Sequence, residues 1–283
     1  MDTTFEQMQA LWRADTVYRD ELFAGRVALV PGGAGGIGRA VALLFARLGA
    51  SVVISGRKAD KLAAVADFAR ERGAEVIAIP ADMREPDQVA ALYAGVAERC
   101  GRLDYLVNAA GGQYPGHAID FSAKGWRAVV DNNLHGTWNL MQAAAQHWRA
   151  QGTPGAIVNV IAVVDRGMPG VAHSIAARAG IIGACRTVAV EWAPLQIRVN
   201  CVAPGLTATE GLNVYPPEAV KEFPLANPMR RPGTAMEIAE ACVYLSAPSA
   251  SFVTGEVLTV DGGGCLWGEL WTAGRPAWFE TGG

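Results

Sequence analysis

The sequence predicts an α/β fold: a doubly wound, Rossmann-type, seven-stranded parallel sheet in a single domain. Two observations support this. Short β-branched runs alternate with longer amphipathic stretches, and a glycine-rich turn follows the first run. Apolar strands separated by helix-length segments are typical of a parallel sheet that helices cover on both faces. The expected strands are residues 27–30, 52–54, 76–79, 105–107, 157–160, 197–202 and 257–260.

Composition excludes several classes of partner. The chain has 283 residues, of which 51% are hydrophobic, and its net charge is -3, so we expect no nucleic-acid partner. The apolar windows are short and broken by charges, and the first residues lack a signal-peptide core, so we expect no membrane span. Five cysteines without CxxC spacing indicate thiols in a reducing cytoplasm, and no metal site is expected.

Three segments are expected along the chain. Residues 1–22 form an N-terminal helical extension, because Phe5, Met8, Leu11 and Trp12 recur at helical spacing. Residues 23–264 form a dinucleotide-binding catalytic domain, with a substrate lid near 206–233. Residues 265–283 form a tail that we expect to pack on its own domain or on a neighbouring subunit, with membrane contact as a third option. Its aromatic residues are Trp267, Trp271, Trp278 and Phe279.

The glycine-rich turn predicts a dinucleotide site. It lies between the first strand and a helix over residues 39–48, where a helix N-terminus offers free N–H groups to a pyrophosphate. A plain glycine-rich turn is the alternative. The expected contacts come from Gly32, Gly36, Ile37 and Gly38.

The end of the second strand favours NADPH over NADH. No acid stands there to bond the ribose 2′-hydroxyl, and Arg57 and Lys58 follow directly. A guanidinium can form two hydrogen bonds with a 2′-phosphate, and a lysine adds charge. The alternative is that both are solvated residues at the start of a helix.

These motifs resemble the short-chain dehydrogenase/reductase family over about residues 22–264. The glycine turn matches the family's Thr-Gly-x-x-x-Gly-x-Gly with Pro31 in place of threonine, and residues 108–111 match its Asn-Asn-Ala-Gly. The resemblance implies that Asp82 contacts the adenine and that Pro204 and Gly205 begin the segment beside the nicotinamide. The further cofactor-binding residues that it implies are Met83, Asn108, Ala109, Ala110, Gly111, Arg178, Thr207 and Thr209.

Within that family the chain is similar to peroxisomal trans-2-enoyl-CoA reductases and to bacterial proteins labelled citronellol or citronellal dehydrogenases, with 2,4-dienoyl-CoA reductases as more distant relatives. The matching stretches are residues 111–113, 124–126, 173–180 and 188–193. The chain also departs from them, because Ile161 and Ala162 lie where the usual catalytic serine falls.

The family's Tyr-x-x-x-Lys pair is replaced here by Ser174 and Arg178. Carbonyl reduction must protonate an alkoxide, for which a lysine-activated tyrosine is suited. Serine is a far weaker acid, and a guanidinium stays charged and does not relay protons. The replacement therefore disfavours alcohol/ketone interconversion by the usual route.

Conjugate reduction of an enoyl thioester makes a different demand: donors must hold the enolate oxygen while water or a side chain protonates C2. Ser174 is a candidate donor, or alternatively a helix cap. Arg178 is expected to clamp the nicotinamide ribose. Asn133 is expected to order water or brace a helix. Tyr114, on a loop near the pocket, is the candidate substitute phenol. Asp165 is a weaker candidate.

We therefore expect an NADPH-dependent reductase of the C2–C3 double bond of an enoyl thioester, with an acyl-CoA as substrate. One alternative is a dehydrogenase of a terpenoid or other alcohol or carbonyl. Another is a non-catalytic NADP-binding sensor or partner subunit. Arg230 and Arg231 of the lid are either CoA-phosphate contacts or ordinary surface residues, and His173 is expected to point away from the site. The family resemblance implies a homodimer or homotetramer.

Overall fold

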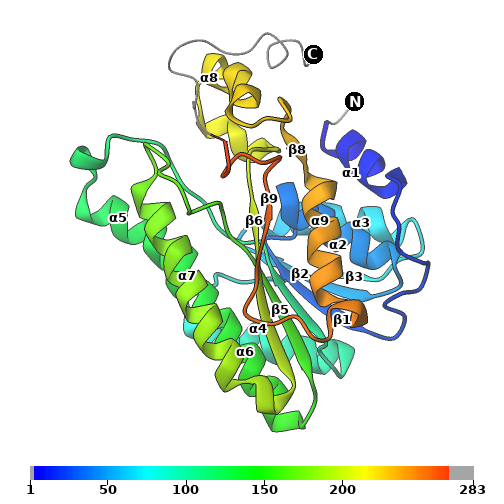
Figure 1. Ribbon diagram of the computed structural model, residues 1–283. Helices are drawn as coiled ribbons and strands as arrows, with labels where there is room; N and C mark the ends of the chain where they lie inside the picture. The colour runs from blue at the N-terminus through cyan, green and yellow to red at the C-terminus, as the bar shows by residue number, and fades with distance from the viewer. Residues whose placement is uncertain (1–2, 268–283) are drawn as a thin grey trace.

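The structure, a computed structural model, describes residues 3–267. Seven strands form one parallel sheet in the order β3-β2-β1-β4-β5-β6-β9, which confirms the predicted fold class (Figure 1). The expected tail residues Trp271, Trp278 and Phe279 lie outside the described part. The strands are β1 (Val27–Pro31), β2 (Ser51–Gly56), β3 (Val76–Pro80), β4 (Tyr105–Asn108), β5 (Gly155–Val160), β6 (Ile197–Pro204) and β9 (Val257–Val260).

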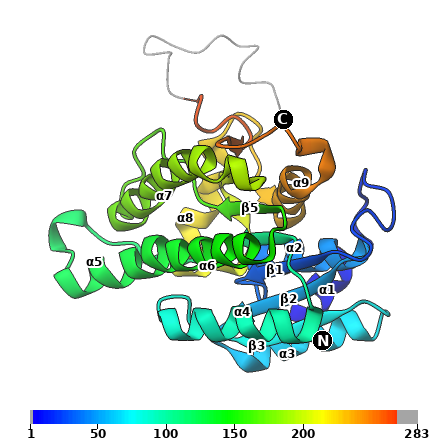
Figure 2. The same ribbon diagram turned by 90° about the horizontal axis from the view of Figure 1, so that it is seen from below.

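Helices cover both faces of the sheet and enclose two hydrophobic cores (Figures 1 and 2). On one face lie α1 (Thr3–Arg13), α2 (Gly36–Arg47), α3 (Ala59–Arg70) and α9 (Ala235–Ser246). On the other face lie α4 (Pro86–Cys100), α6 (Gly136–Gln151) and α7 (Ala172–Glu191). A shorter helix, α5 (Ala123–Val130), continues into α6 through a π-helical turn, Asp131–His135.

The interior strand β1 contributes side chains to both hydrophobic cores. Ala28 and Val30 pack into the core under α2 and α9, whereas Val27 and Leu29 pack into the core under α4 and α6. Successive strand side chains point to opposite faces, so a strand buried on both sides must be apolar throughout. This is why the sequence shows continuous apolar runs here rather than alternation. In residues 3–267, no helix combines the length and the apolarity that a bilayer span requires.

The lid segment is closed at its base by a second, two-stranded sheet that the sequence did not reveal. β7 (Thr207–Ala208) pairs in parallel with β8 (Gly233–Thr234). Between them the chain forms the 3₁₀ turn η4 (Glu210–Val214), the helix α8 (Pro217–Glu222) and the turn η5 (Phe223–Ala226). The pairing brings the two ends of a long insertion together beside the carboxyl end of the main sheet.

At the opposite edge, Asp104 ties the starts of β1 and β4 together. Its carboxylate accepts the backbone N–H of Val27 at 2.9 Å, Arg26 Nη1 at 2.9 Å and Arg102 Nε at 2.8 Å. The carboxylate is buried, whereas both arginine side chains are about half exposed. The carboxylate therefore accepts a hydrogen bond from a buried backbone N–H and also pairs with two arginine cations.

The Asp104→Asn variant is expected to lower the free energy of unfolding by about 2 kcal/mol, because an amide nitrogen cannot accept the bonds that the carboxylate accepts. Chemical denaturation measures this change. Asp120→Asn, which alters an exposed residue, is the control and is expected to leave stability unchanged. Equal stabilities of the two variants would contradict the role assigned to Asp104.

Candidate functional site

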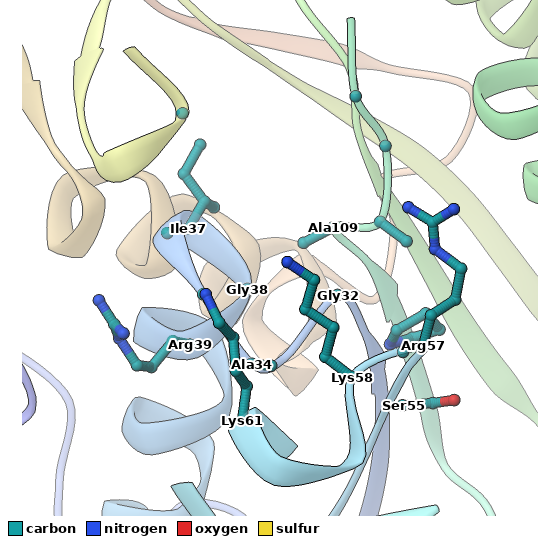
Figure 3. Close-up of a pocket in the computed structure, with 18 of the residues that line it drawn as sticks. Gly32, Ala34, Ile37, Gly38, Arg39, Ser55, Arg57, Lys58, Lys61 and Ala109 are labelled. Carbon is teal, nitrogen blue, oxygen red and sulfur yellow. The ribbon is translucent and has the colours of Figure 1, made fainter. Parts of the chain in front are cut away.

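A cavity of about 760 Å³ opens at the carboxyl ends of the strands, next to β1 and β4 (Figure 3). The order of the sheet changes direction between these two strands, so the chains that leave them diverge and leave a crevice. The glycine turn after β1 forms one wall, and the predicted residues Gly32, Gly36, Ile37 and Gly38 all line it. The N-terminus of α2 opens onto this space.

Two of these glycines are required by close packing. Gly32 has φ +82°, and a Cβ there would lie 2.7 Å from the backbone of Ala109 in the loop after β4. A Cβ at Gly38 would collide with the carbonyl oxygen of Gly32. Backbone therefore meets backbone on both sides of the turn, which leaves N–H groups of the helix start accessible to an anion. This arrangement fits the pyrophosphate of a dinucleotide.

Three cations lie at the end of the cavity beside β2. The predicted Arg57 and Lys58 both line it, and so does Lys61, which sequence reasoning missed (Figure 3). Within residues 3–267, none of the three side chains makes a hydrogen bond or salt bridge. Lys61 lies one helical turn after Lys58, so the start of α3 was the signal that could have identified it. The charge available here suits a phosphate.

A fourth cation, Arg39, was also missed, because it lies within the apolar helix after the glycine turn. It is only 3% exposed, lines the cavity, and donates to Gln7 Oε1 of α1 at 2.6 Å. It also forms an ion pair with Glu210 of the lid, at 3.1 Å. Arg39 of α2 therefore contacts both the N-terminal helix α1 and residue Glu210 of the lid segment.

Asp82 and Met83, implied as adenine contacts, both line the cavity. Asp82 accepts a two-point hydrogen bond from Arg84, and this bond holds the pKa of its carboxyl below the ordinary value. Asp82 is therefore ionised and positioned at the side of the cavity that Arg57 also lines.

The loop after β4 supplies the facing wall. Ala109, Ala110 and Gly111 line the cavity, whereas Asn108 is buried beneath them. The Asn108 side chain accepts the N–H of Ala110 at 3.1 Å and donates to Thr137 at 3.0 Å. Asn108 thus shapes the turn and does not border the cavity.

Of the residues after β6, Thr209 reaches the cavity, where it faces Gly36. Thr207 is buried and donates to the carbonyl of Gly205 at 3.1 Å. Pro204 and Gly205 do not line the cavity. Gly205 packs so closely on Asp261 that a Cβ would lie 2.6 Å from its side chain.

Arg178 is held at the inner end of the cavity. Its Nη1 donates to the carbonyl of Val160, at the end of β5, at 2.8 Å. Its Nη2 lies against Gly111, and a Cβ added at Gly111 would collide with this nitrogen. Desolvation lowers the pKa of Arg178 from 12.5 to about 10, so the guanidinium stays charged at neutral pH.

Ser174 lies one helical turn before Arg178 and is 2% exposed. The helix α7 begins at Ala172 after Val171, and no side chain caps it, so Ser174 is not the helix cap. Its hydroxyl makes no hydrogen bond among residues 3–267, and Ser174 does not line the cavity.

Asn133 is fully buried in the π-helical turn and braces the loop after β4. Its Oδ1 accepts the N–H of Gly112 at 3.0 Å, and its Nδ2 donates to the Gly112 carbonyl at 2.7 Å. The paired bonds give Asn133 a bracing role, but they brace the loop after β4 and not a helix. They fix the loop against Arg178.

Tyr114, the expected substitute phenol, does not line the cavity; its hydroxyl lies against Gly125 of α5. Its ring meets the ring of the buried His173 edge to face, with centroids 4.7 Å apart, and His173 stacks on Phe121 at 4.4 Å. His173 Nε2 has no hydrogen-bond partner in the described part of the chain. Asp165 is exposed on the loop after β5. The rings of Tyr114, His173 and Phe121 form an aromatic cluster.

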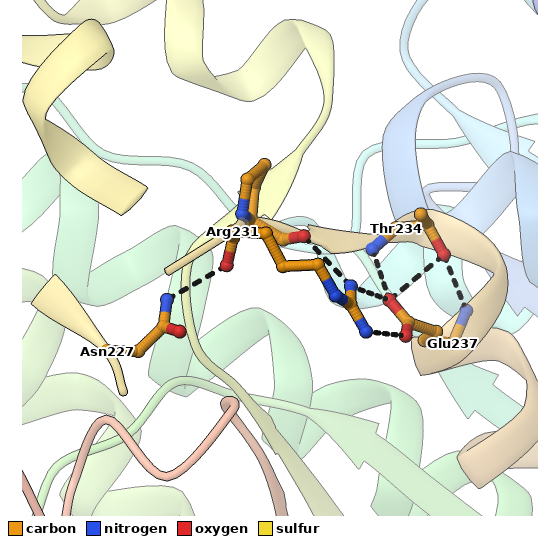
Figure 4. Close-up of polar contacts among 5 residues, drawn as sticks. Asn227, Arg231, Thr234 and Glu237 are labelled. Carbon is orange, nitrogen blue, oxygen red and sulfur yellow. Dashed lines mark hydrogen bonds and ion pairs between the residues drawn. The ribbon is translucent and has the colours of Figure 1, made fainter. Parts of the chain in front are cut away.

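The far end of the lid is anchored by a polar network (Figure 4). Arg231 forms an ion pair with Glu237 at 2.6 Å, and Thr234 and Glu237 form a capping box at the start of α9. These contacts lower the pKa of Glu237 to about 2. Asn227 Nδ2 donates to the carbonyl of Arg231 at 2.9 Å. Arg231 is thus engaged in holding the lid, whereas the neighbouring Arg230 is exposed.

A contact between the lid and the loop after β4 was also missed. Gln113 Nε2 donates to the hydroxyl of Tyr215 at 2.7 Å. Gln113 lines the cavity, and so does Val214, next to Tyr215. This contact depends on folding of the lid over a segment about 100 residues away, so no local pattern indicated it.

Comparison with known proteins gives one family. The family model described as enoyl-(acyl carrier protein) reductase matches residues 32–264. A curated relative, the peroxisomal 2,4-dienoyl-CoA reductase SPS19 of Saccharomyces cerevisiae, is 35% identical over 253 residues, which are 87% of this chain and 86% of the relative. Glucose 1-dehydrogenase of Gluconobacter oxydans is 37% identical over 260 residues, covering 89% and 96% of the two chains.

Among solved structures, the citronellol catabolism dehydrogenase AtuB of Pseudomonas aeruginosa PAO1 superposes with a TM-score of 0.79. It is 37% identical in sequence, and the match covers 89% of this chain and 100% of that one. These similarities agree with the glycine turn and the strand order described above. The chain belongs to the short-chain dehydrogenase/reductase family of oxidoreductases.

Proposed function

We propose that the protein reduces the C2–C3 double bond of an enoyl thioester, such as an acyl-CoA, with NADPH. The observation that carries this proposal is the pair Ser174 and Arg178 at the positions of the family's tyrosine and lysine. Arg178 is charged, bonded to the Val160 carbonyl and packed against the cofactor loop. It is suited to clamp a nicotinamide ribose and not to relay protons.

Conjugate reduction fits such a site because its negative charge develops on the thioester oxygen. NADPH, when bound, supplies the hydride. The chain's own groups then need to hold the oxygen and keep the loop in place, while solvent provides the proton for C2. Ser174 places its hydroxyl on the face of α7 that carries Arg178, buried behind the cavity wall, and would have to become accessible when substrate binds. Asn133 fixes the loop after β4.

The preference for NADPH rests on charge. Arg57, Lys58 and Lys61 border the cavity at the end of β2, without a salt bridge among the described residues. Ser55 and Gly56 occupy the strand end, where an acid would repel a 2′-phosphate. Cations that have no ion-pair partner in the described part of the chain favour the more highly charged cofactor.

The similarity to a citronellol catabolism dehydrogenase supports a second candidate, oxidation or reduction of a terpenoid alcohol or carbonyl. The similarity to 2,4-dienoyl-CoA reductases supports the thioester. A homodimer or homotetramer remains our expectation from the family resemblance, and a cytoplasmic location remains our expectation from the cysteines. A non-catalytic NADP-binding role remains the alternative that the altered pair suggests.

The Arg57→Ser variant is expected to weaken NADPH binding by about 10-fold to 100-fold, because a charge-assisted contact to the 2′-phosphate is lost. NADH affinity is expected to stay unchanged, since NADH lacks that phosphate. Fluorescence titration of both cofactors measures this. Arg149→Ser, on the exposed face of α6, is the control. Equal losses for NADPH and NADH would argue against a 2′-phosphate contact.

The Gly111→Ala variant is expected to displace Arg178 and weaken cofactor binding by about tenfold or more, because the new methyl would collide with the guanidinium. Titration with NADPH measures the effect. Gly183→Ala is the matched control: this glycine also lies near Arg178 in sequence, on α7, but a Cβ there meets nothing within 4 Å. Normal NADPH affinity in Gly111→Ala would refute the clamp.

The function itself is tested by following NADPH oxidation against enoyl-CoAs of several lengths, citronellal and simple ketones. Turnover of enoyl thioesters alone, with a saturated thioester as product, is the expected result. Turnover of carbonyls alone would replace the proposal by the terpenoid candidate. Tight NADPH binding without any turnover would favour the non-catalytic role.

A further inference from the structure

Arg39 is a buried cation in an otherwise apolar stretch of α2, beside the glycine turn (Figure 3). It is 3% exposed, and its Nε has no hydrogen-bond partner in the described part of the chain. Its guanidinium forms an ion pair with Glu210 of the lid and donates to Gln7 of α1. A guanidinium buried to this degree depends on such partners, because little water reaches it to replace them.

The lid begins directly over the glycine turn. Thr209 and Glu210 line the same cavity as Gly35 and Gly36. A Cβ added at Gly35 would lie 3.2 Å from Glu210 Oε1, and one added at Gly36 would lie 3.5 Å from the Cβ of Thr209. The first residues of the lid therefore lie against the turn that fits the pyrophosphate of a dinucleotide.

The Glu210 carboxylate does not occupy the anion site at the start of α2. No side chain caps this helix at Gly35, so the N–H groups of its first turn stay available to a ligand. The carboxylate instead pairs with Arg39 at 3.1 Å, and this pairing offsets its negative charge. A bound pyrophosphate and a lid held by this ion pair are therefore compatible.

The N-terminal helix supports the ion pair from another side. Arg39 Nη2 pairs with Glu210 and also donates to Gln7 Oε1 at 2.6 Å, so a single nitrogen lies between α1 and the lid. The helix α1 is itself fixed to the domain, since Met8 is buried in the core and Arg47 donates to two carbonyls near the end of α1. It precedes residue 32, where the match to the family model begins. Gln7 thus adds a contact from outside the matched region.

We propose that the ion pair between Arg39 and Glu210 is a latch that holds the lid over a bound dinucleotide, and that Gln7 positions Arg39 for it. When the pair breaks, the start of the lid moves off the glycine turn and the cofactor is released. The Glu210 side chain is 41% exposed, so water reaches one partner and the latch opens at a modest cost. It therefore governs the rate of cofactor release, whichever substrate the enzyme reduces.

The test measures the dissociation rate of NADPH from the full chain by stopped-flow fluorescence, with excess NADP⁺ to occupy the emptied site. We expect Glu210→Gln to raise this rate about fivefold, because the amide keeps the shape of the side chain and loses its charge. Glu218→Gln is the matched control. It removes an exposed carboxylate of the same lid that has no ion pair among the described residues, and it is expected to release NADPH at the wild-type rate.

The role of Gln7 is tested in the same assay. Gln7→Leu is expected to raise the dissociation rate about twofold, because the ion pair remains and loses its support. The double variant Gln7→Leu/Glu210→Gln is expected to release NADPH no faster than Glu210→Gln alone, since Gln7 acts through the pair. Effects that multiply in the double variant would show that Gln7 does not act through Arg39 and Glu210.

Two results would overturn the latch. An unchanged rate in Glu210→Gln would show that the ion pair does not hold the lid, and a slower rate would show that the carboxylate repels the cofactor. The assay contains no substrate, so a failure to reduce enoyl thioesters would leave this inference standing. If the chain binds NADH in place of NADPH, the same comparison with NADH and NAD⁺ decides it, because the latch lies at the pyrophosphate and not at the 2′-phosphate.

Discussion

The contact between two backbones at the centre of the sheet is the constraint on which the rest of this structure depends. The turn after β1 and the loop after β4 meet where the strand order changes direction, at Gly32 and Ala109. Only glycine allows this approach, since a Cβ at Gly32 would lie 2.7 Å from the neighbouring backbone. This approach leaves a crevice, and both the start of α2 and the cations after β2 border it.

A second set of contacts carries this geometry to the inner end of the site. Arg178 links α7 to the end of β5 through the Val160 carbonyl, and Gly111 has no side chain to separate it from the loop after β4. Asn133 holds the next residue of that loop. The inner end of the cavity is thus bordered by backbone groups and one buried cation, a set that suits the binding and polarisation of a ligand better than proton relay.

The lid joins the site through side chains from distant parts of the chain. Glu210 pairs with Arg39, which also bonds Gln7 of the N-terminal helix, and Tyr215 accepts from Gln113. Side-chain contacts of Arg39 therefore connect α2 with both the lid segment and the N-terminal helix. Arg39 could not be identified from its neighbours in sequence, because a buried arginine within an apolar helix gives no periodic signal of its partners.

The sequence by itself determined the α/β class, the seven strands and the glycine turn, because these depend on local apolar periodicity and on a backbone geometry that only glycine permits. It also indicated Arg57 and Lys58, which follow directly from a strand end. Only the tertiary structure decided that Thr209 rather than Thr207 reaches the cavity, that Asn133 braces a loop, and that Tyr114 does not border the cavity. Side-chain direction in loops depends on packing against segments far away in sequence, and that information is absent from any local pattern.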